Sequence, residues 1–152
     1  MAVEVRPARA DELEALLPLI AGYQRFYGVE SPDDERNASF FGRFVAPGER
    51  GLLLGAFAEG GEPVGFACVY WTFSSVGACE AALMNDLYVS GDARSGGIGR
   101  ALIDAAAAAA GERGLGSLIW QTHLDNRQAQ RLYERTGARR SALFEYELET
   151  EG

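Results

Sequence analysis

The stretch that most constrains the fold is residues 86–111, DLYVSGDARSGGIGRALIDAAAAAAG, where an apolar strand-like run passes through a glycine-rich turn into an alanine-rich helix. The residues that leave the first turn of this helix almost without side chains are Ser95, Gly96, Gly97 and Gly99. The N–H groups of a first helical turn have no intrahelical partner and lie at the positive end of the helix dipole. The spacing therefore favours a backbone site for an anion, most naturally a diphosphate, flanked by Arg94 and Arg100.

Two common nucleotide loops do not fit this turn. A Walker loop ends in Gly-Lys-Ser/Thr, whereas this turn ends in Gly99, Arg100 and Ala101. A dinucleotide fingerprint requires a third glycine at the position that Leu102 occupies. From the glycines alone, a turn that merely connects a strand to a helix remains the alternative.

Apolar periodicity divides the rest of the chain into alternating segments. The expected helices are 11–28, which Pro18 would kink or split, 31–45 with Ser31 as its cap, 97–114 and 126–137. The expected strands are 3–8, 51–59, 64–75, 79–89, 116–124 and 140–149. Antiparallel strands followed by a βαβ unit predict an α+β domain with a mixed sheet.

Length and charge limit the classes of protein. A chain of 152 residues is long enough for one core, so we expect a single domain over residues 1–152. A net charge of −8 argues against nucleic acid as the main partner. No signal peptide and no membrane-spanning run is recognisable, which predicts a soluble, cytoplasmic protein without a membrane partner. Cys68, Cys79 and His123 give no metal-ligand spacing, so we expect no metal and two free thiols.

Two motifs together resemble the GNAT superfamily of acetyl-CoA-dependent N-acetyltransferases. Arg94-x-x-Gly97-x-Gly99 is similar to the family's pyrophosphate loop, Arg/Gln-x-x-Gly-x-Gly/Ala. The run NRQAQRLYERTGA resembles its N-x-x-A-x-x-x-Y-x-x-x-G helix. The segment order is similar over residues 3–148, and the closest likeness is to the histone, polyamine and D-amino-acid acetyltransferase branch. The resemblance implies helices on both faces of a mostly antiparallel sheet, with acetyl-CoA bound at the βαβ unit.

The resemblance also implies roles for particular residues. By this resemblance, the contacts to the coenzyme would come from Leu87, Tyr88, Val89, Arg94, Ser95, Gly96, Gly97, Ile98, Gly99, Arg100, Asn126 and Ala129. The backbone of Leu87 and Val89 would pair with the pantetheine arm, which lies between two splayed strands. Tyr133 would be the general acid that protonates the departing thiolate, and a tyrosine packed in the core is its alternative.

The sequence does not assign the general base or the residues of the acceptor pocket. Relatives often place a glutamate on the fourth strand, but Asn85 stands at that position and cannot accept a proton at neutral pH. The carboxylates and imidazole that remain as candidate bases are Glu80, Asp86, His123 and Glu145. Aromatic side chains that either line the acceptor site or belong to the core are Tyr23, Phe26, Tyr27, Tyr70 and Trp71.

These features predict an enzyme that acetylates a primary amine by direct attack in a ternary complex. The acceptor would be a small-molecule amine or a lysine side chain, and the protein would be a homodimer. A non-catalytic acyl-CoA-binding module, favoured by Asn85, and a protein lysine acetyltransferase are the alternatives.

Overall fold

A computed structural model describes residues 2–46, 48–94 and 96–152 of the chain. The chain divides into two compact units, Met1–Gln121 and Thr122–Gly152, and each is described by itself. The single domain over residues 1–152 therefore stays a prediction. No helix among the described residues is long and apolar enough to cross a membrane.

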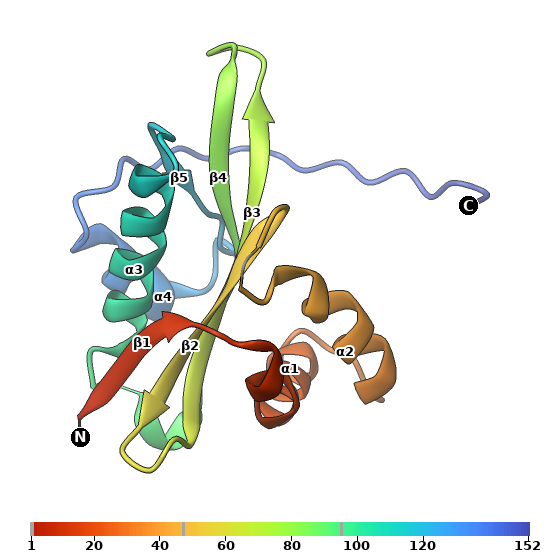
Figure 1. The fold of residues 1–152 in the computed structure, drawn as a ribbon. Helices are drawn as coiled ribbons and strands as arrows, with labels where there is room; N and C mark the ends of the chain where they lie inside the picture. The colour runs from red at the N-terminus through yellow and green to blue at the C-terminus, as the bar shows by residue number, and fades with distance from the viewer. Residues whose placement is uncertain (1, 47, 95) are drawn as a thin grey trace. The chain divides into compact units, whose positions relative to one another are not determined.

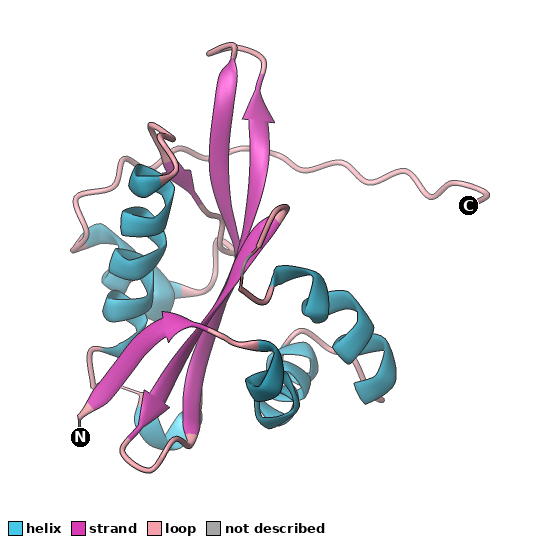
Figure 2. Ribbon diagram, in the orientation of Figure 1, coloured by secondary structure: helices cyan, strands magenta, loops and turns pink. Residues whose placement is uncertain are grey.

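Within the described residues, one sheet has the strand order β1-β2-β3-β4-β5 (Figure 2). Its strands are β1 (Val3–Pro7), β2 (Gly51–Ala58), β3 (Pro63–Ser74), β4 (Cys79–Val89) and β5 (Leu118–Ile119). The first four are antiparallel to their neighbours, whereas β5 is parallel to β4. A parallel neighbour requires a crossover connection, which α3 (Ile98–Glu112) supplies. The predicted α+β class and βαβ unit are confirmed.

Helices cover both faces of the sheet, as predicted. Figure 1 shows α3 on one face, with α1 (Leu13–Phe26) and α2 (Asp34–Phe41) on the other. The side chains that α3 buries are Ile98, Leu102, Ile103, Ala106 and Ala110. Two of these five side chains are alanines, whose small size favours close packing of the helix on the strands. We call these two sides of the sheet the α3 face and the α1 face.

The α1 face is aromatic as well as aliphatic. Its buried cluster is Ala8, Leu16, Leu17, Ile20, Phe41, Phe44, Leu53, Phe66 and Cys68, with Tyr23, Tyr70 and Tyr88 packed against it. α1 continues through Pro18 without a break, so the predicted split is wrong. The burial of Leu16, Leu17 and Ile20 compensates for the backbone hydrogen bond that a proline cannot donate.

The helix ends differ partly from the sequence prediction. α2 begins at Asp34, and the side chain of Asp33 accepts a hydrogen bond from the N–H of Arg36, so the cap is Asp33 and not Ser31. A carboxylate is an equally good N-cap, and sequence alone did not distinguish the two positions. Gly114, with φ +83°, follows the end of α3 in the left-handed conformation that was expected for it or Gly111.

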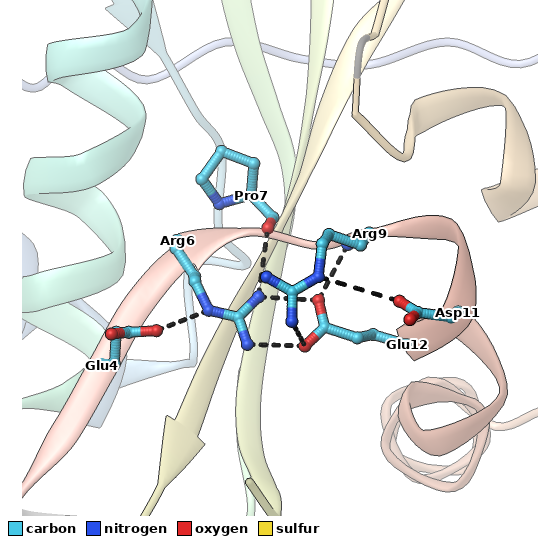
Figure 3. Close-up of polar contacts among 6 residues, drawn as sticks. All are labelled: Glu4, Arg6, Pro7, Arg9, Asp11 and Glu12. Carbon is cyan, nitrogen blue, oxygen red and sulfur yellow. Dashed lines mark hydrogen bonds and ion pairs between the residues drawn. The ribbon is translucent and has the colours of Figure 1, made fainter.

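A salt-bridged corner ties β1 to the start of α1 (Figure 3). The guanidinium group of Arg6 donates to both carboxylate oxygens of Glu12, at 2.6 and 2.5 Å. Glu12 also accepts from the backbone N–H of Arg9 at 2.9 Å. The Arg6 hydrogen bonds lower the pKa of Glu12 from 4.5 to about 2. This carboxylate is fully partnered and fixes the approach of β1 to the helix.

A β-bulge interrupts the pairing of β3 with β4. Cys68 is opposite Asp86 and Val69 is opposite Met84, so Asn85 is an extra residue in β4. A bulge bends the strand and changes the direction of the neighbouring side chains. Asp86 is consequently buried on the α1 face, whereas Asn85 is exposed.

The second unit contains α4 (Arg127–Glu134) and an extended segment after it. The predicted strand over residues 140–149 is wrong, because these residues form neither helix nor strand. Their alternation of apolar side chains with glutamates fits a strand, but a strand forms only where a neighbour accepts its hydrogen bonds. For the same reason the strand expected over 116–124 contracts to Leu118–Ile119, the two residues that pair with β4.

Candidate active site

The glycine-rich turn before α3 has the open backbone that an anion site requires. Gly97 is the N-cap of α3 and has φ +80° and ψ 6°, a left-handed conformation that favours glycine. A Cβ atom at Gly97 would have no heavy atom within 4 Å, so the turn is open at this point. The N–H groups of Ile98 and Gly99 belong to the first turn and have no helical carbonyl to bind. These groups fit a diphosphate held by the backbone.

The side chains around this turn have distinct environments. Ile98 is 4% exposed, so only its backbone faces a ligand. Arg94 is exposed, donates from Nε to the carbonyl of Val89 at 3.1 Å, and lies with its guanidinium carbon 5.7 Å from the centre of the Tyr88 ring. Arg100 is bound to Asp104 at 3.1 Å. Ser95 lies outside the described residues, so its predicted role stays a prediction.

The strand leading to the turn has an edge without a partner strand. β5 pairs with β4 only at Ala82 and Leu83, so the ladder stops before the bulge. The N–H of Ser90, the residue after β4, donates to the carbonyl of Val64 in β3. The direction of the backbone groups alternates along an antiparallel strand, so Leu87 and Val89 point away from β3. Their N–H and C=O groups lie on the edge of β4 that β5 leaves unpaired. An extended chain of amides can bind there as an added strand.

Three predicted residues belong to the second unit. Asn126 caps α4, and its side-chain oxygen accepts from the N–H of Ala129 at 3.2 Å, as expected for a cap. Tyr133 is half-buried near the end of the same helix, and its carbonyl accepts from the hydroxyl of Thr136 at 2.6 Å. The motif helix therefore forms as predicted, while the roles of these residues stay predictions.

Beneath the end of α1, Asp86 is a buried carboxylate that is only partly satisfied. It is 4% exposed, and its Oδ1 accepts from Nδ2 of Asn85 at 3.1 Å. Its Oδ2 has no hydrogen-bond partner. The hydroxyl of Tyr23 is near enough to favour the ionised carboxylate but does not complete a hydrogen bond to Oδ2. The native fold thus keeps an unsatisfied oxygen in its interior, which is rare.

Burial governs the titration of this cluster. It raises the pKa of Asp86 above its ordinary 3.8, and the contacts from Tyr23 and Asn85 offset part of that rise. Burial first, and the charge of Asp86 second, raise the pKa values of Tyr23, Tyr27, Cys68 and Tyr70. The tyrosines and the thiol therefore stay protonated at neutral pH.

The other candidate bases do not share this environment. Glu80, His123 and Glu145 are all exposed. Among the described residues no group of three or more His, Cys, Asp or Glu side chains could hold a metal ion. The sequence named Asp86 among four candidates but gave no signal for the bulge that buries it. Adjacent polar residues, Asn85 and Asp86, within an apolar strand were the only hint.

Several proteins of known family or structure are similar to this chain. The sequence model of the Acetyltransferase (GNAT) family matches residues 15–138. The uncharacterized N-acetyltransferase YhfO of Bacillus subtilis (strain 168) is 36% identical over 135 residues, which cover 89% of each chain. The D-amino-acid N-acetyltransferase HPA3 of Saccharomyces cerevisiae is 34% identical over 134 residues, covering 86% of this chain and 81% of that protein.

Solved structures have the same fold. A probable acetyltransferase superposes with a TM-score of 0.83 at 27% identity, over 100% of this chain and 99% of that one. The aminoglycoside N-acetyltransferase AAC(6')-Iy, solved in complex with CoA, superposes with a TM-score of 0.83 at 16% identity, over 97% of this chain and 95% of that one. At 16% identity the likeness extends to the fold alone.

Proposed function

The chain belongs to the GNAT family of acetyltransferases, and we propose that it transfers the acetyl group of acetyl-CoA to a primary amine by direct attack in a ternary complex. Acetyl-CoA-dependent N-acetyl transfer is the activity of an enzyme of this family, and the direct route and the class of amine are the proposal. The observation that carries it is the unpaired edge of β4 beside the open glycine turn of α3.

This chain's backbone supplies most of the coenzyme site that we propose. Bound acetyl-CoA would supply a thioester whose carbonyl carbon is the electrophile. The residues proposed to bind its diphosphate are Arg94, Ser95, Gly96, Gly97, Ile98, Gly99 and Arg100. Leu87 and the N–H of Val89 offer backbone groups to the pantetheine arm at the β4 edge, where the carbonyl of Val89 already accepts from Arg94. Tyr88 packs against the buried cluster of the α1 face. Asn126 and Ala129 are proposed as further contacts on the strength of the motif.

Tyr133 is the proposed general acid. A tyrosine hydroxyl is a donor at neutral pH, and a positioned acid can protonate the departing thiolate. The support is the family motif and the helix that carries it, capped by Asn126. A tyrosine that only packs against its neighbours would contribute to stability and not to turnover.

A small-molecule amine is the acceptor that we favour over a protein lysine. HPA3, which is 34% identical, is named for acetylation of D-amino acids. The free cysteines Cys68 and Cys79 are consistent with the reducing cytoplasm, where we propose that the enzyme acts.

A second copy of the chain is the partner that we propose for the extended segment after α4. Its large apolar side chains Leu143, Phe144, Tyr146 and Leu148 are 85%, 90%, 91% and 88% exposed. Exposed apolar groups of this size are typical of surfaces that another protein covers. Sedimentation equilibrium should show a dimer that dissociates in the Phe144→Ser/Leu148→Ser double variant, and a wild-type monomer would contradict the proposal.

Initial-rate kinetics test the proposed reaction. Release of free coenzyme A is followed with benzylamine, spermidine and D-phenylalanine as acceptors, and the acetylated product is identified by mass spectrometry. Direct attack predicts intersecting double-reciprocal lines and full activity of Cys79→Ala. Parallel lines or an acetylated Cys68 or Cys79 would contradict direct attack. No turnover of any amine, with acetyl-CoA bound, would favour the non-catalytic module.

A further inference from the structure

One carboxylate oxygen of Asp86 can still accept a hydrogen bond or bind a cation. Of the described residues, its Oδ2 is the only buried side-chain nitrogen or oxygen without a hydrogen bond. The residue is 4% exposed, so bulk water does not replace the missing partner. Leaving a charged group buried and unsatisfied costs folding free energy. A buried carboxylate oxygen without a partner within the chain calls for a partner from outside it.

The surroundings of Asp86 indicate the charge of this partner. The groups near it are Tyr23 from α1, Tyr27 at the C-cap of α1, Cys68 and Tyr70 from β3, and its neighbour Asn85 in β4. None of these carries a positive charge. The ion pairs found among the described residues do not include Asp86. The complement of an unpaired buried carboxylate is a cation.

The aromatic side chains near Asp86 indicate the chemical class of that cation. The ring centres of Tyr23 and Phe66 are 5.7 Å apart, and Tyr88 lies 6.2 Å from each of them. Aromatic faces attract an ammonium ion and also pack against an apolar body. An organic ammonium ion suits this aromatic surrounding better than a metal ion, which needs several oxygen ligands.

The cluster reaches the surface at the end of α1. Tyr27 is 48% exposed, yet the charge of Asp86 acts on its hydroxyl. Leu87, whose backbone faces the open edge of β4, follows Asp86 directly. An amine entering past Tyr27 would therefore reach Asp86 one residue from the edge where we place the pantetheine arm.

We propose that Asp86 is the acceptor-recognition residue, which binds the ammonium group of a small primary amine whose apolar body lies among Tyr23, Tyr27 and Tyr70. This inference rests on the proposed function and adds the residue that selects the acceptor. Only the ionised carboxylate forms this ion pair, and the bound ammonium group releases one proton to solvent before its nitrogen attacks the thioester carbonyl. Acceptor binding should therefore weaken as the pH falls through the pKa of Asp86.

The decisive variant is Asp86→Asn, compared with the exposed control Glu62→Gln. The acceptor is whichever of benzylamine, spermidine and D-phenylalanine the wild-type enzyme acetylates fastest. We expect kcat/KM for the amine to fall at least about 100-fold in Asp86→Asn, a loss typical of a deleted charged partner. Acetyl-CoA affinity by calorimetry should stay within twofold, and the melting temperature should be equal or higher. Glu62→Gln should match the wild type.

Other outcomes overturn the inference. A kcat/KM within threefold of wild type would mean that a water molecule, and not the acceptor, satisfies Oδ2. An Asp86→Asn protein that melts far lower or fails to fold would show that the carboxylate is structural. Loss of acetyl-CoA affinity would assign it to the coenzyme site instead.

A second variant changes only the environment of Asp86. Tyr23→Phe removes the hydroxyl that favours the ionised carboxylate, so the acidic limb of the kcat/KM profile should move to higher pH. An unmoved limb would contradict the assignment. If the wild type acetylates none of the three amines, the proposed function fails. Binding of benzylamine against neutral benzyl alcohol, with loss of the preference in Asp86→Asn, still decides the inference.

Discussion

The α3 face and the α1 face of the sheet bury different chemistry. The side chains that α3 buries are all apolar, and two of them are alanines that are 0% and 2% exposed. On the α1 face lie Asn37 and Asp86, the buried polar side chains of the described chain. Asn37 exchanges two hydrogen bonds with Gln24, both 2.8 Å long, whereas Asp86 keeps a free oxygen.

This difference separates two kinds of recognition. A coenzyme common to a whole family can be bound by backbone groups. On the α3 side this binding requires glycines, which leave the backbone N–H groups at the start of α3 open to the ligand. An acceptor must be distinguished from other amines by side chains, and we propose that the tyrosines and the carboxylate on the α1 side do so. Substitutions on the two faces should therefore affect different steps of the reaction.

The largest expected effect belongs to Tyr133, a residue of the second unit. Tyr133→Phe removes only a hydroxyl, so packing should change little. Because a positioned acid contributes about 10²–10⁴-fold, kcat should fall within that range with acetyl-CoA affinity nearly unchanged. Steady-state kinetics are read beside a thermal melt and a calorimetric titration. A wild-type kcat with a lowered melting temperature would assign Tyr133 to packing.

On the α3 side, Gly97→Val should separate coenzyme binding from acceptor recognition. It places a side chain in the open turn and forces a left-handed conformation on a β-branched residue. Losing one or more hydrogen bonds to a charged group should weaken acetyl-CoA binding by about 10- to 100-fold or more. The control is Gly111→Val in the exposed part of α3, where affinity should not change. Equal affinities in Gly97→Val and wild type would exclude the turn from the site.

Glu12, whose carboxylate oxygens both accept hydrogen bonds at the salt-bridged corner, provides the contrast to Asp86. Glu12→Gln removes the charge that Arg6 binds, and should lower the free energy of unfolding by about 1–3 kcal/mol without changing kcat/KM. Asp11→Asn, at the exposed 3.8 Å pair with Arg9, should cost less than about 0.5 kcal/mol. Because the pKa of Glu12 falls to about 2 on folding, its contribution is lost as the pH drops from 4.5 toward 2. Urea unfolding of both variants measures this.

The smallest effect is the pH dependence of stability due to Asp86. Its pKa is raised on folding, so the folded state holds the proton more tightly and stability falls as the pH rises from 3.8 through the raised value. Asp86→Asn should remove this fall, and the difference from wild type should have the opposite slope to that of Glu12→Gln. Urea midpoints measured between about pH 3 and 7 give both slopes. A constant difference would mean that burial does not perturb Asp86.

Local signals in the sequence were sufficient for much of the fold. The Asn126 cap and the left-handed Gly114 were predictable because caps depend on residues within one helical turn. The bulge at Asn85 was not, because it depends on the register between Cys68 and Asp86, two positions distant in sequence. The strand expected over 140–149 failed for a related reason, since alternation does not supply a pairing partner.

The candidate site divides in the same way. The glycine turn could be recognised from residues 94–99 because its function lies in a contiguous backbone. The residues around Asp86 could be named from the sequence as candidates, but not their juxtaposition, because α1, β3 and β4 each contribute part of the cluster. Tyr23 and Tyr70 have the spacing of ordinary core residues, and only the folded arrangement brings them to a carboxylate.

The most direct test of the account is a titration of the Asp86 carboxyl carbon by ¹³C NMR, with and without benzylamine. The account predicts a pKa above 3.8 in the free protein, because burial disfavours the charge. Added benzylamine should lower that pKa, because a bound ammonium ion stabilises the carboxylate, and benzyl alcohol should leave it unchanged. An Asp86 pKa that responds equally to both compounds, or to neither, would contradict the claim that the α1 face recognises the acceptor through this residue.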